Sequence, residues 1–347
     1  MIPSFDAFSR HGNPAANGSR PIWLEFTRRA MACQFDVLLH PERPPEGPEA
    51  AVAALEIIAS LEQLLSVYIP TSDLCRVNHR AHELPVDVSL PTVQMIQLAL
   101  EIHALTEGAF DITAASLSQA WGFSSRQGRM PDAQEIEQAL ARVGSQHIRV
   151  DAQQQQVRLD RPVALNPGGI GKGYALDCAA DLLLERGVEE FAIHGGKSSI
   201  RAHGRQLLSQ SQPGWNIAVR HPEQSERALG TLVLKNQSLG TSGPANQFFY
   251  FRGTRYGHII DPRSGWPAQG ALSLSVLHAS AAWADALATG LYVLGIERTI
   301  EFCQQHPEVG VLAILPSSKQ GGIEVVTCNL DEDTWQPHRA SDGISSP

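Results

Sequence analysis

A histidine and an aspartate stand three residues apart in the segment His258-Ile-Ile-Asp-Pro-Arg-Ser-Gly-Trp-Pro267, where an expected strand ends in a polar turn. An imidazole, with a reference pKa of about 6.5, accepts protons near neutrality, and a neighbouring carboxylate can orient it. The same residues also suit a plain turn built by Asp261, Pro262 and Gly265, with His258 exposed. The two interpretations are compatible, and the sequence leaves both open.

A second candidate pair, Asp285 and Thr289, lies within the segment Ala284-Asp-Ala-Leu-Ala-Thr289. Residues four apart on a helix share one face, with Cβ atoms about 5–6 Å apart. Two oxygen ligands on a rigid helix suit Mg²⁺, which completes its shell with water and substrate phosphate. A polar pair on an alanine-rich helix is more often its solvent-facing side, so this segment alone does not establish a metal site.

Four glycines and a lysine fill the segment Asn166-Pro-Gly-Gly-Ile-Gly-Lys-Gly-Tyr174, between an expected strand and an expected helix. Glycines let backbone N–H groups approach phosphate oxygens, the helix N-terminus adds positive potential, and Lys172 adds a charge. Asn166 and Gly173 depart from the Walker A pattern. The segment therefore predicts either an anion cradle or a tight turn with a solvated lysine.

The composition restricts the function classes. The chain has 347 residues, of which 43% are hydrophobic, and its 27 Lys and Arg against 36 Asp and Glu give a net charge of −9. Such a balance argues against a general binder of nucleic acid or anionic membranes, so any anionic ligand must be held by a local site. Neither H-E-x-x-H nor G-x-S-x-G occurs, which removes the zinc-peptidase and α/β-hydrolase patterns.

Cysteine usage and hydropathy bear on the compartment. The five cysteines are far apart and include no C-x-x-C pair, which favours reduced thiols over a disulfide framework or a zinc site. The first twenty residues hold no apolar signal core, and no apolar run of about 18 residues is present. We expect a cytoplasmic protein.

Apolar periodicity predicts helices in the runs Val52 to Leu65, Met95 to Leu105, Tyr174 to Arg186 and Ala281 to Leu294, and from Asp132. Short β-type runs predict strands at His147 to Val150, Val157 to Leu159, Val163 to Leu165, Phe191 to Ile193, Trp215 to Val219, Thr231 to Leu234, Phe248 to Phe251, Leu272 to Leu277 and Val309 to Leu315. Their close succession favours antiparallel pairing, so we expect an α+β fold of mainly antiparallel sheets flanked by helices. Residues 1–20 are expected to be a disordered leader, 21–329 one domain, and 330–347 a polar tail.

Seven blocks, taken in order between about residues 25 and 316, resemble the ApbE family of FAD:protein FMN transferases. The blocks are Met31-Ala-Cys33, Tyr68 to Asn78, Gly108 to Asp111 with Trp121 to Phe123, Gly168 to Tyr174, Gly240 to Gly243, His258 to Pro267 and Ala284 to Thr289. The resemblance implies a T-fold-like architecture and an enzyme that binds FAD and Mg²⁺. Such an enzyme moves FMN onto a Thr or Ser hydroxyl in a D-x-x-[ST]-G-A-[ST] sequence of a target protein and releases AMP.

The resemblance also implies a role for each matching residue. Residues expected at FAD are Met31 and Tyr68 at the flavin or adenine, Ala109, Phe110 and Asp111 in a contacting loop, Asn166 and Lys172 on the adenylate and pyrophosphate side, and Ile259. Mg²⁺ is expected on the carbonyl of Gly169 together with Asp285 and Thr289. His258 is expected to be the base that acts on the incoming hydroxyl.

The chain departs from the usual family pattern at several positions. The family usually has an acidic residue where Asn166 stands and G-G-D where this chain reads Gly195-Gly-Lys197. Met31-Ala-Cys33 stands for M-G-T, and Ile112 for the proline expected after Asp111. Two alternatives therefore accompany the transferase: a pyrophosphatase that hydrolyses FAD to FMN and AMP, and a non-catalytic relative that only binds FAD. The chain has no acceptor motif of its own.

Overall fold

The computed structural model describes residues 23–40, 44–206, 214–222, 224, 226–244, 247–317 and 322–338. The expected leader lies outside the described residues, as does the part of the expected tail beyond residue 338. The helices are α1 Gly47–Leu65, α2 Asp73–Arg80, α3 Leu90–Leu105, α4 Ala115–Ala120, α5 Ala133–Leu140, α6 Gly171–Glu185, α7 Ala281–Leu294 and α8 Ile296–Gln305. The strands are β1 Leu24–Ala30, β2 Cys33–Leu39, β3 Val86–Asp87, β4 Ile148–Asp151, β5 Gln156–Leu159, β6 Phe191–Gly195, β7 Ser199–His203, β8 Trp215–Arg220, β9 Ala228–Leu234, β10 Ser238–Ser242, β11 Phe248–Phe251, β12 Thr254–Gly257, β13 Ser273–His278, β14 Gly310–Pro316, β15 Ile323–Cys328 and β16 Trp335–Pro337.

The centre of the fold is an eight-stranded sheet with the order β1-β2-β6-β7-β10-β13-β14-β15. Its strands are joined antiparallel throughout. Both faces of this sheet are covered, which β2 illustrates: Val37 and Leu39 face one apolar cluster, while Leu38 between them faces another. The expected α+β class with mainly antiparallel sheets is confirmed.

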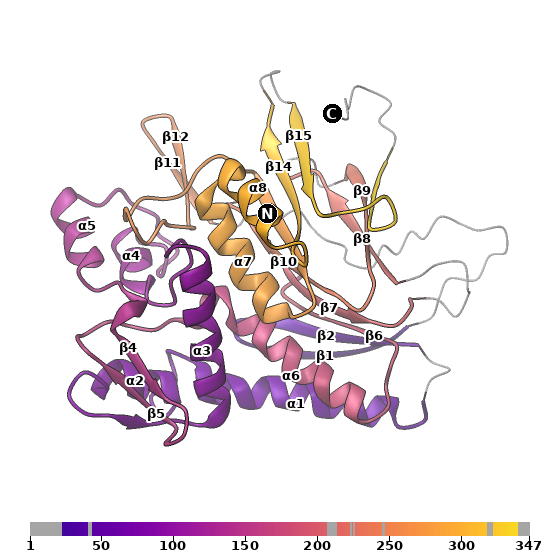
Figure 1. Ribbon diagram of the computed structural model, residues 1–347, viewed down its shortest axis with the longest axis horizontal. Coiled ribbons are helices and arrows are strands. Elements are labelled where there is room, and N and C mark those ends of the chain that lie inside the picture. The colour runs from indigo at the N-terminus through magenta and orange to yellow at the C-terminus, as the bar shows by residue number, and fades with distance from the viewer. Residues whose placement is uncertain are drawn as a thin grey trace.

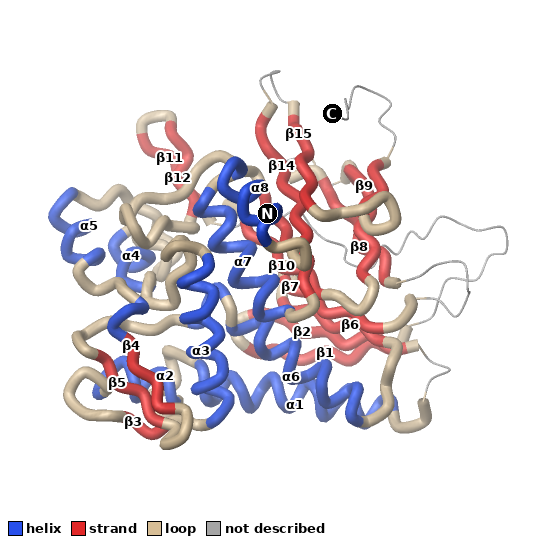
Figure 2. The backbone as a smooth tube through the Cα atoms, viewed as in Figure 1, coloured by secondary structure: helices blue, strands red, loops and turns tan. Residues whose placement is uncertain are grey.

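Helices α1, α6 and α7 cover one face of the sheet, as Figures 1 and 2 show. Small side chains on α7, such as Ala284, Ala286 and Ala288, are fully buried and let this helix lie close to the sheet and to α6. The expected start of a helix at Asp132 is confirmed, because Asp132 and Glu135 form a capping box at the beginning of α5. The helical layer thus brings the N-terminal ends of α6 and α7 together over the sheet.

A smaller sheet, β16-β9-β8, covers the opposite face through a cluster centred on Trp215. Its third strand, Trp335–Pro337, falls within the expected polar tail. Trp335 packs over Gly230, where a Cβ would lie 2.4 Å from the indole ring, and this contact anchors the segment on β9. Residues 335–337 therefore belong to the packed structure.

One expected strand is wrong. Residues 163–165 do not join a sheet. Instead, the side chain of Asn78 pairs with both backbone groups of Leu165: its Nδ2 donates to the carbonyl oxygen at 2.9 Å, and its Oδ1 accepts from the amide at 2.7 Å. A side-chain amide reproduces the hydrogen bonds of a strand neighbour, so extended backbone is stabilised here without a ladder.

Within the part of the chain that the structure describes, no helix combines the length and the apolar character needed to cross a bilayer.

Candidate functional site

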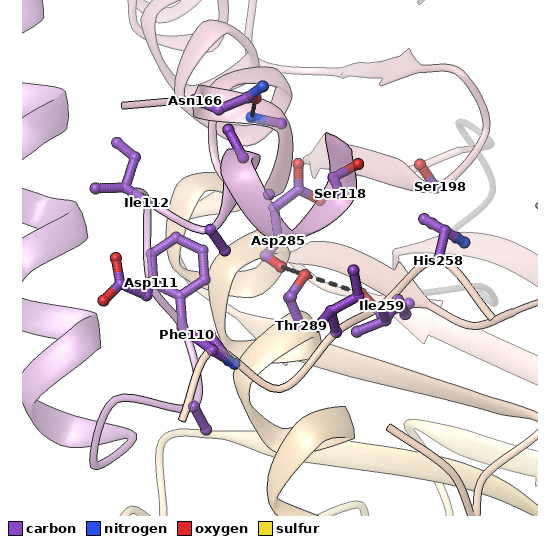
Figure 3. Close-up of a pocket in the computed structure, with 18 of the residues that line it drawn as sticks. Phe110, Asp111, Ile112, Ser118, Asn166, Ser198, His258, Ile259, Asp285 and Thr289 are labelled. Carbon is purple, nitrogen blue, oxygen red and sulfur yellow. Dashed lines mark hydrogen bonds between the residues drawn. The ribbon is translucent and has the colours of Figure 1, made fainter. Parts of the chain in front are cut away.

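A cavity of about 370 Å³ opens where the first turn of α6, the middle of α7, the loop after α3 and the end of β10 meet (Figure 3). Ten of the twelve residues expected at a functional site line it: Ala109, Phe110, Asp111, Asn166, Gly169, Lys172, His258, Ile259, Asp285 and Thr289. Segments up to 180 residues apart are therefore gathered around one cavity, from Ala109 to Thr289. Met31 and Tyr68 are not among the residues that line it.

Helices α6 and α7 hold each other by reciprocal contacts at their N-termini. Asp285 on α7 accepts a hydrogen bond from the amide of Gly173 on α6 at 2.9 Å. Asp177 on α6 in turn accepts from the amides of Ala281 and Ala282 at 2.8 and 3.0 Å. Each carboxylate satisfies amide groups that a helix N-terminus leaves without an intrahelical partner. The glycine-rich segment and the acidic helix are thereby fixed relative to one another.

The close approach of these elements requires glycine at two positions. A Cβ on Gly173 would lie 2.1 Å from the carbonyl oxygen of Ala281. A Cβ on Gly240 of β10 would lie 2.4 Å from the carbonyl oxygen of Ala284. Backbone atoms cannot yield to such contacts cheaply, so the glycines allow α7 to pack directly on α6 and β10.

Asp285 is a buried carboxyl group at the floor of the cavity. Its Oδ2 accepts from Gly173 and from the hydroxyl of Ser199, both at 2.9 Å, and lies 3.7 Å from Nζ of Lys172. Burial raises the pKa of Asp285, while Lys172 and the two hydrogen bonds oppose that rise. A nearby cation therefore favours the ionised form of this carboxyl group.

The oxygens beside Asp285 form a set that suits a hard cation. The hydrogen bonds from Gly173 and Ser199 both end on Oδ2, which leaves Oδ1 for the cavity. One turn later, Oγ1 of Thr289 lies 3.1 Å from Oγ of Ser242, and a Cβ on Gly169 would lie 3.6 Å from the same Oγ1. Carboxylate, hydroxyl and carbonyl oxygens are typical Mg²⁺ ligands. The residues present fit that ion, although the described part of the chain contains no cluster of three or more His, Cys, Asp or Glu side chains that would hold a metal.

The glycine-rich segment faces the cavity from the α6 side. The side-chain Oδ1 of Asn166 accepts a hydrogen bond from the amide of Gly168 at 2.9 Å. The backbone N–H of Asn166 donates to the carbonyl oxygen of Ile112 at 2.7 Å. Lys172, in the first turn of α6, has a side chain that is one-quarter exposed. Its ammonium group and the helix N-terminus put positive potential on the same wall, which favours an anionic group in the cavity.

His258 lines the opposite wall (Figure 3). Its Nδ1 lies 3.2 Å from the carbonyl oxygen of Gln247, which can only accept, so Nδ1 carries the proton and Nε2 keeps its lone pair. Burial lowers the pKa of His258, and the charge of Lys172 lowers it further. A neutral imidazole with a free Nε2 is suited to accept a proton.

Asp261 does not orient this histidine. Its carboxylate makes two contacts of 2.9 Å with the guanidinium of Arg263, and its backbone closes the turn to Gly265. The interpretation of this segment as a turn is therefore correct for Asp261, whereas His258 is half-buried in the cavity wall and is oriented by Gln247.

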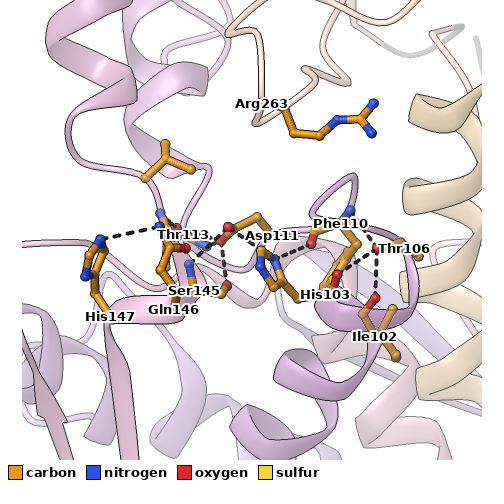
Figure 4. A network of polar contacts seen from close by, with 12 residues as sticks. Ile102, His103, Thr106, Phe110, Asp111, Thr113, Ser145, Gln146, His147 and Arg263 are labelled. Carbon is orange, nitrogen blue, oxygen red and sulfur yellow. Dashed lines mark hydrogen bonds and ion pairs between the residues drawn. The ribbon is translucent and has the colours of Figure 1, made fainter.

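The carboxylate of Asp111 points away from the cavity into a polar network (Figure 4). It accepts from the amide and hydroxyl of Thr113 at 2.8 and 2.6 Å and from those of Ser145 at 3.1 and 2.7 Å. His103 lies 3.3 Å from its Oδ2 and contacts the carbonyl of Phe110 at 3.0 Å. These contacts shape the loop that carries Phe110 and Ile112 into the cavity wall.

Met31 and Tyr68 lie elsewhere. Met31 sits in the tight turn between β1 and β2 with a φ of 48°, and its amide donates to Glu62. The side chain of Tyr68 is 81% exposed in the loop after α1. The nearby thiol of Cys33 is influenced by the charges of Lys172 and Asp285, while burial raises its pKa to about 11. The Met31–Cys33 turn thus lies beside the site without lining its cavity.

Five hydroxyl residues of the cavity lining had no role assigned from the sequence: Ser118, Ser198, Thr241, Ser242 and Ser273. Ser242 belongs to the block Gly240 to Gly243, whose two glycines around two hydroxyl residues were the available signal. Ser198 likewise comes shortly after two glycines, Gly195 and Gly196, in the turn between β6 and β7.

Comparisons with known proteins identify the family of this chain. The model of the ApbE family matches residues 31–313. A FAD:protein FMN transferase of Klebsiella pneumoniae (strain 342) is 34% identical over 300 residues, which cover 84% of each chain. The flavin transferase ApbE of Vibrio cholerae superposes with a TM-score of 0.77 at 27% identity, covering 88% of this chain and 97% of that one. The ApbE protein of Thermotoga maritima superposes with a TM-score of 0.76 at 28% identity, covering 87% and 96%. The chain belongs to the ApbE family.

Proposed function

We propose that this protein transfers FMN from FAD to a Thr or Ser hydroxyl of an acceptor protein and releases AMP, with Mg²⁺ as cofactor. The observation that carries the proposal is the meeting of His258, Lys172 and Asp285 around one cavity in a member of a family whose relatives are named FAD:protein FMN transferases. The acceptor is proposed to present its hydroxyl within a D-x-x-[ST]-G-A-[ST] sequence.

The chain's own groups divide the work on the two sides of the pyrophosphate. The acceptor hydroxyl attacks the phosphorus of the FMN half, the bridging P–O bond breaks, and AMP leaves with that bridging oxygen. The hydroxyl proton passes to Nε2 of His258, whose Nδ1–H stays on Gln247. Lys172 and the amides at the start of α6 offset the charge that builds on the leaving phosphate.

Asp285, Thr289 and the Gly169 carbonyl are proposed as the Mg²⁺ ligands, with Ser242 beside them. When bound, the ion supplies charge neutralisation to the phosphate oxygens. Asn166, Ala109, Phe110 and Ile259 are proposed to contact the nucleotide, since they line the same cavity. Asp111 is proposed to hold the contacting loop in place, and Met31 and Tyr68 to take part only if FAD extends beyond the cavity.

The test is intact-mass spectrometry of an acceptor domain that carries the motif, incubated with the protein, FAD and Mg²⁺, with AMP quantified in parallel. We expect a mass gain of one FMN that EDTA abolishes and that His258→Ala and Asp285→Ala each reduce at least about 100-fold. His82→Ala, which changes a histidine in the loop after α2, is the matched control. Transfer that survives both cavity variants would contradict the proposal. AMP without acceptor labelling would identify a pyrophosphatase, and FAD binding without either product would identify a binding protein.

We propose further that the domain expected at residues 21–329, together with strand β16, acts as one unit in the cytoplasm. The continuous sheet from β1 to β15 supports a single domain, and the five free cysteine thiols are typical of a reducing compartment. Cell fractionation followed by thiol alkylation tests the location: recovery of the protein with cytosolic markers and with five reactive thiols after denaturation is expected.

A further inference from the structure

The β11–β12 hairpin carries an aromatic and cationic surface that the proposed chemistry does not use. One face of the hairpin is partly covered, because Phe249 and Tyr256 pack against Trp121 with ring centroids 6.2 and 5.6 Å away. In a hairpin the alternate residues point to the other face. The side chains there are exposed: Phe248 is 41% and Tyr250 67% accessible, and Arg255 lies on the same face opposite Tyr250. Phe251, at the tip on the side of Phe249, is 38% accessible.

Two arginines stand among these rings. The guanidinium of Arg255 lies 4.0 Å from the centroid of the Phe248 ring, and that of Arg252 lies 5.2 Å from the centroid of Phe251. Neither has a carboxylate partner among the described residues, and residues 247–258 contain no Asp or Glu. Nε of Arg255 is buried without a hydrogen-bond partner. In a chain with a net charge of −9, this hairpin is a local cationic patch.

The hairpin is continuous with the cavity wall. β12 ends at Gly257, and the next residue is His258. Both the amide and Nδ1 of His258 contact the carbonyl of Gln247, one residue before β11, so the base of the hairpin and the imidazole are fixed together. Strands of four residues project about 13 Å from this base. A peptide bound along the hairpin would therefore have one end close to Nε2 of His258.

We propose that the exposed surface of the hairpin, formed by Phe248, Tyr250 and Arg255 on one face and by Phe251 and Arg252 at the tip, binds an acidic segment of the acceptor protein that leads to the modified hydroxyl. The inference rests on the proposed function for the identity of the acceptor. Exposed aromatic rings and arginines are the residues that most often dominate protein interfaces. The two arginines, of which Arg255 donates to the carbonyl of Pro244 at 3.3 Å, have no carboxylate partner among the described residues and complement carboxylates by charge.

The register specifies where the carboxylate belongs. Arg255 precedes His258 by three residues, which is about 10 Å of extended chain. An acceptor segment extended alongside β12, with its hydroxyl at His258, places the side chain three positions earlier beside Arg255. This is the spacing between the Asp and the Thr or Ser of the acceptor motif proposed above, and Arg252 at the tip meets residues further toward the N-terminus of the segment.

The test compares transfer by Arg252→Glu, Arg255→Glu and Tyr250→Ser with transfer by the wild-type protein as the acceptor domain is varied, at saturating FAD and Mg²⁺. We expect each variant to raise the acceptor KM, by about tenfold for Arg255→Glu, with kcat and FAD affinity within twofold. With an acceptor in which Arg replaces the motif Asp, the acceptor KM of Arg255→Glu should return most of the way to the wild-type value. The same acceptor should show no improvement in KM with the wild-type protein. Arg158→Glu, on the exposed side of β5, is the matched charge reversal and should change nothing.

Direct binding separates failure of this inference from failure of the proposed function. If the wild type transfers no FMN, fluorescence anisotropy of a labelled acceptor domain with the FAD-loaded, Mg²⁺-loaded full chain still decides: salt-sensitive binding weakened by Arg255→Glu supports the docking face. An acceptor affinity or KM that ignores all three substitutions overturns it. Binding to phosphatidylglycerol vesicles that Arg252→Glu abolishes, with acceptor affinity unchanged, overturns it as well and assigns the face to a lipid surface.

Discussion

Replacing Asp111 with Asn tests whether this carboxylate acts by shaping the nucleotide loop or by touching FAD. Its Oδ1 accepts from Thr113 N and Oγ1 and from Ser145 Oγ, and its Oδ2 accepts from Ser145 N and faces His103. An amide can keep the three bonds on its oxygen, but its NH₂ group then meets the Ser145 N–H, donor against donor. The side chain is only 3% exposed, so water does not repair that conflict.

The expected loss follows from these contacts. One buried amide without an acceptor costs about 1–3 kcal/mol, and loss of the charge removes a further few tenths to 1 kcal/mol from each remaining bond. Since such contributions are not additive, we take about 3 kcal/mol for the decrease in unfolding free energy. At an unfolding entropy of about 2 cal/mol/K per residue, a chain of this size loses about 1.5 °C per kcal/mol, so Tm falls by about 5 °C.

Differential scanning calorimetry supplies Tm, and FAD fluorescence titration supplies Kd. For a structural role we expect the drop in Tm with no more than about a threefold rise in the FAD Kd, because the loop retains Phe110 and Ile112 at the cavity. Asp160→Asn removes an exposed carboxylate paired with Arg149 and should move Tm by less than about 1.5 °C. A Tm within 1 °C of wild type together with a tenfold or greater loss of FAD affinity would refute the reasoning and assign Asp111 a direct contact.

Three other predictions follow from the same geometry. Gly173→Ala should lower the unfolding free energy by more than about 3 kcal/mol in chemical denaturation, since the new Cβ meets the Ala281 carbonyl at 2.1 Å; wild-type stability would mean that α6 and α7 can separate freely. The kcat/KM for FMN transfer should fall only below about pH 6.5, because burial lowers the pKa of His258 and the neutral base persists into weak acid. Lys172→Met removes a positive neighbour, which should raise that pKa and move the acidic limb of the profile upward, and a downward shift would contradict the assignment of the limb to His258. Asn78→Ala should cost about 2 kcal/mol by leaving both backbone groups of Leu165 unpaired, and Asn78→Asp, which keeps the acceptor but sets a carboxylate oxygen against the Leu165 carbonyl, should cost at least as much; a near-neutral Asn78→Asp would contradict the role of the Nδ2 donor.

The features predicted successfully from the sequence are those encoded within a few residues. The capping box at Asp132 and Glu135 fixes the start of α5 by contacts three residues apart. Asp285 and Thr289 share a helix face because of the α-helical period, and the segment Asn166 to Tyr174 is a turn into a helix because its glycines permit one. Local rules therefore placed these residues on their elements, whereas Ala109, Phe110, Asp111 and Ile259 of the cavity lining came from the resemblance to the ApbE family.

Contacts between distant residues were not accessible in this way. One partner of Asp111 is Ser145, 34 residues later, and nothing near Asp111 in the sequence indicates it. Asp261 lies close to His258 in the chain, but Arg263 is closer still and competes for the carboxylate, which leaves Gln247 to orient the imidazole. Residues 163–165 have the composition of a strand, yet Asn78 takes the place of a neighbouring strand.

The crossed carboxylates of α6 and α7 have a thermodynamic consequence for nucleotide binding. Because Asp177 and Asp285 tie each helix to the first turn of the other, the ordering entropy of the phosphate wall is lost when the chain folds and not when the ligand arrives. A pyrophosphate therefore meets a rigid wall, and the heat-capacity change on binding should reflect the loops around Phe110 and Ile259 alone. Adaptation to a different nucleotide would proceed in those loops, since loss of Asp177 or Asp285 from one helix also removes hydrogen bonds from the first turn of the other.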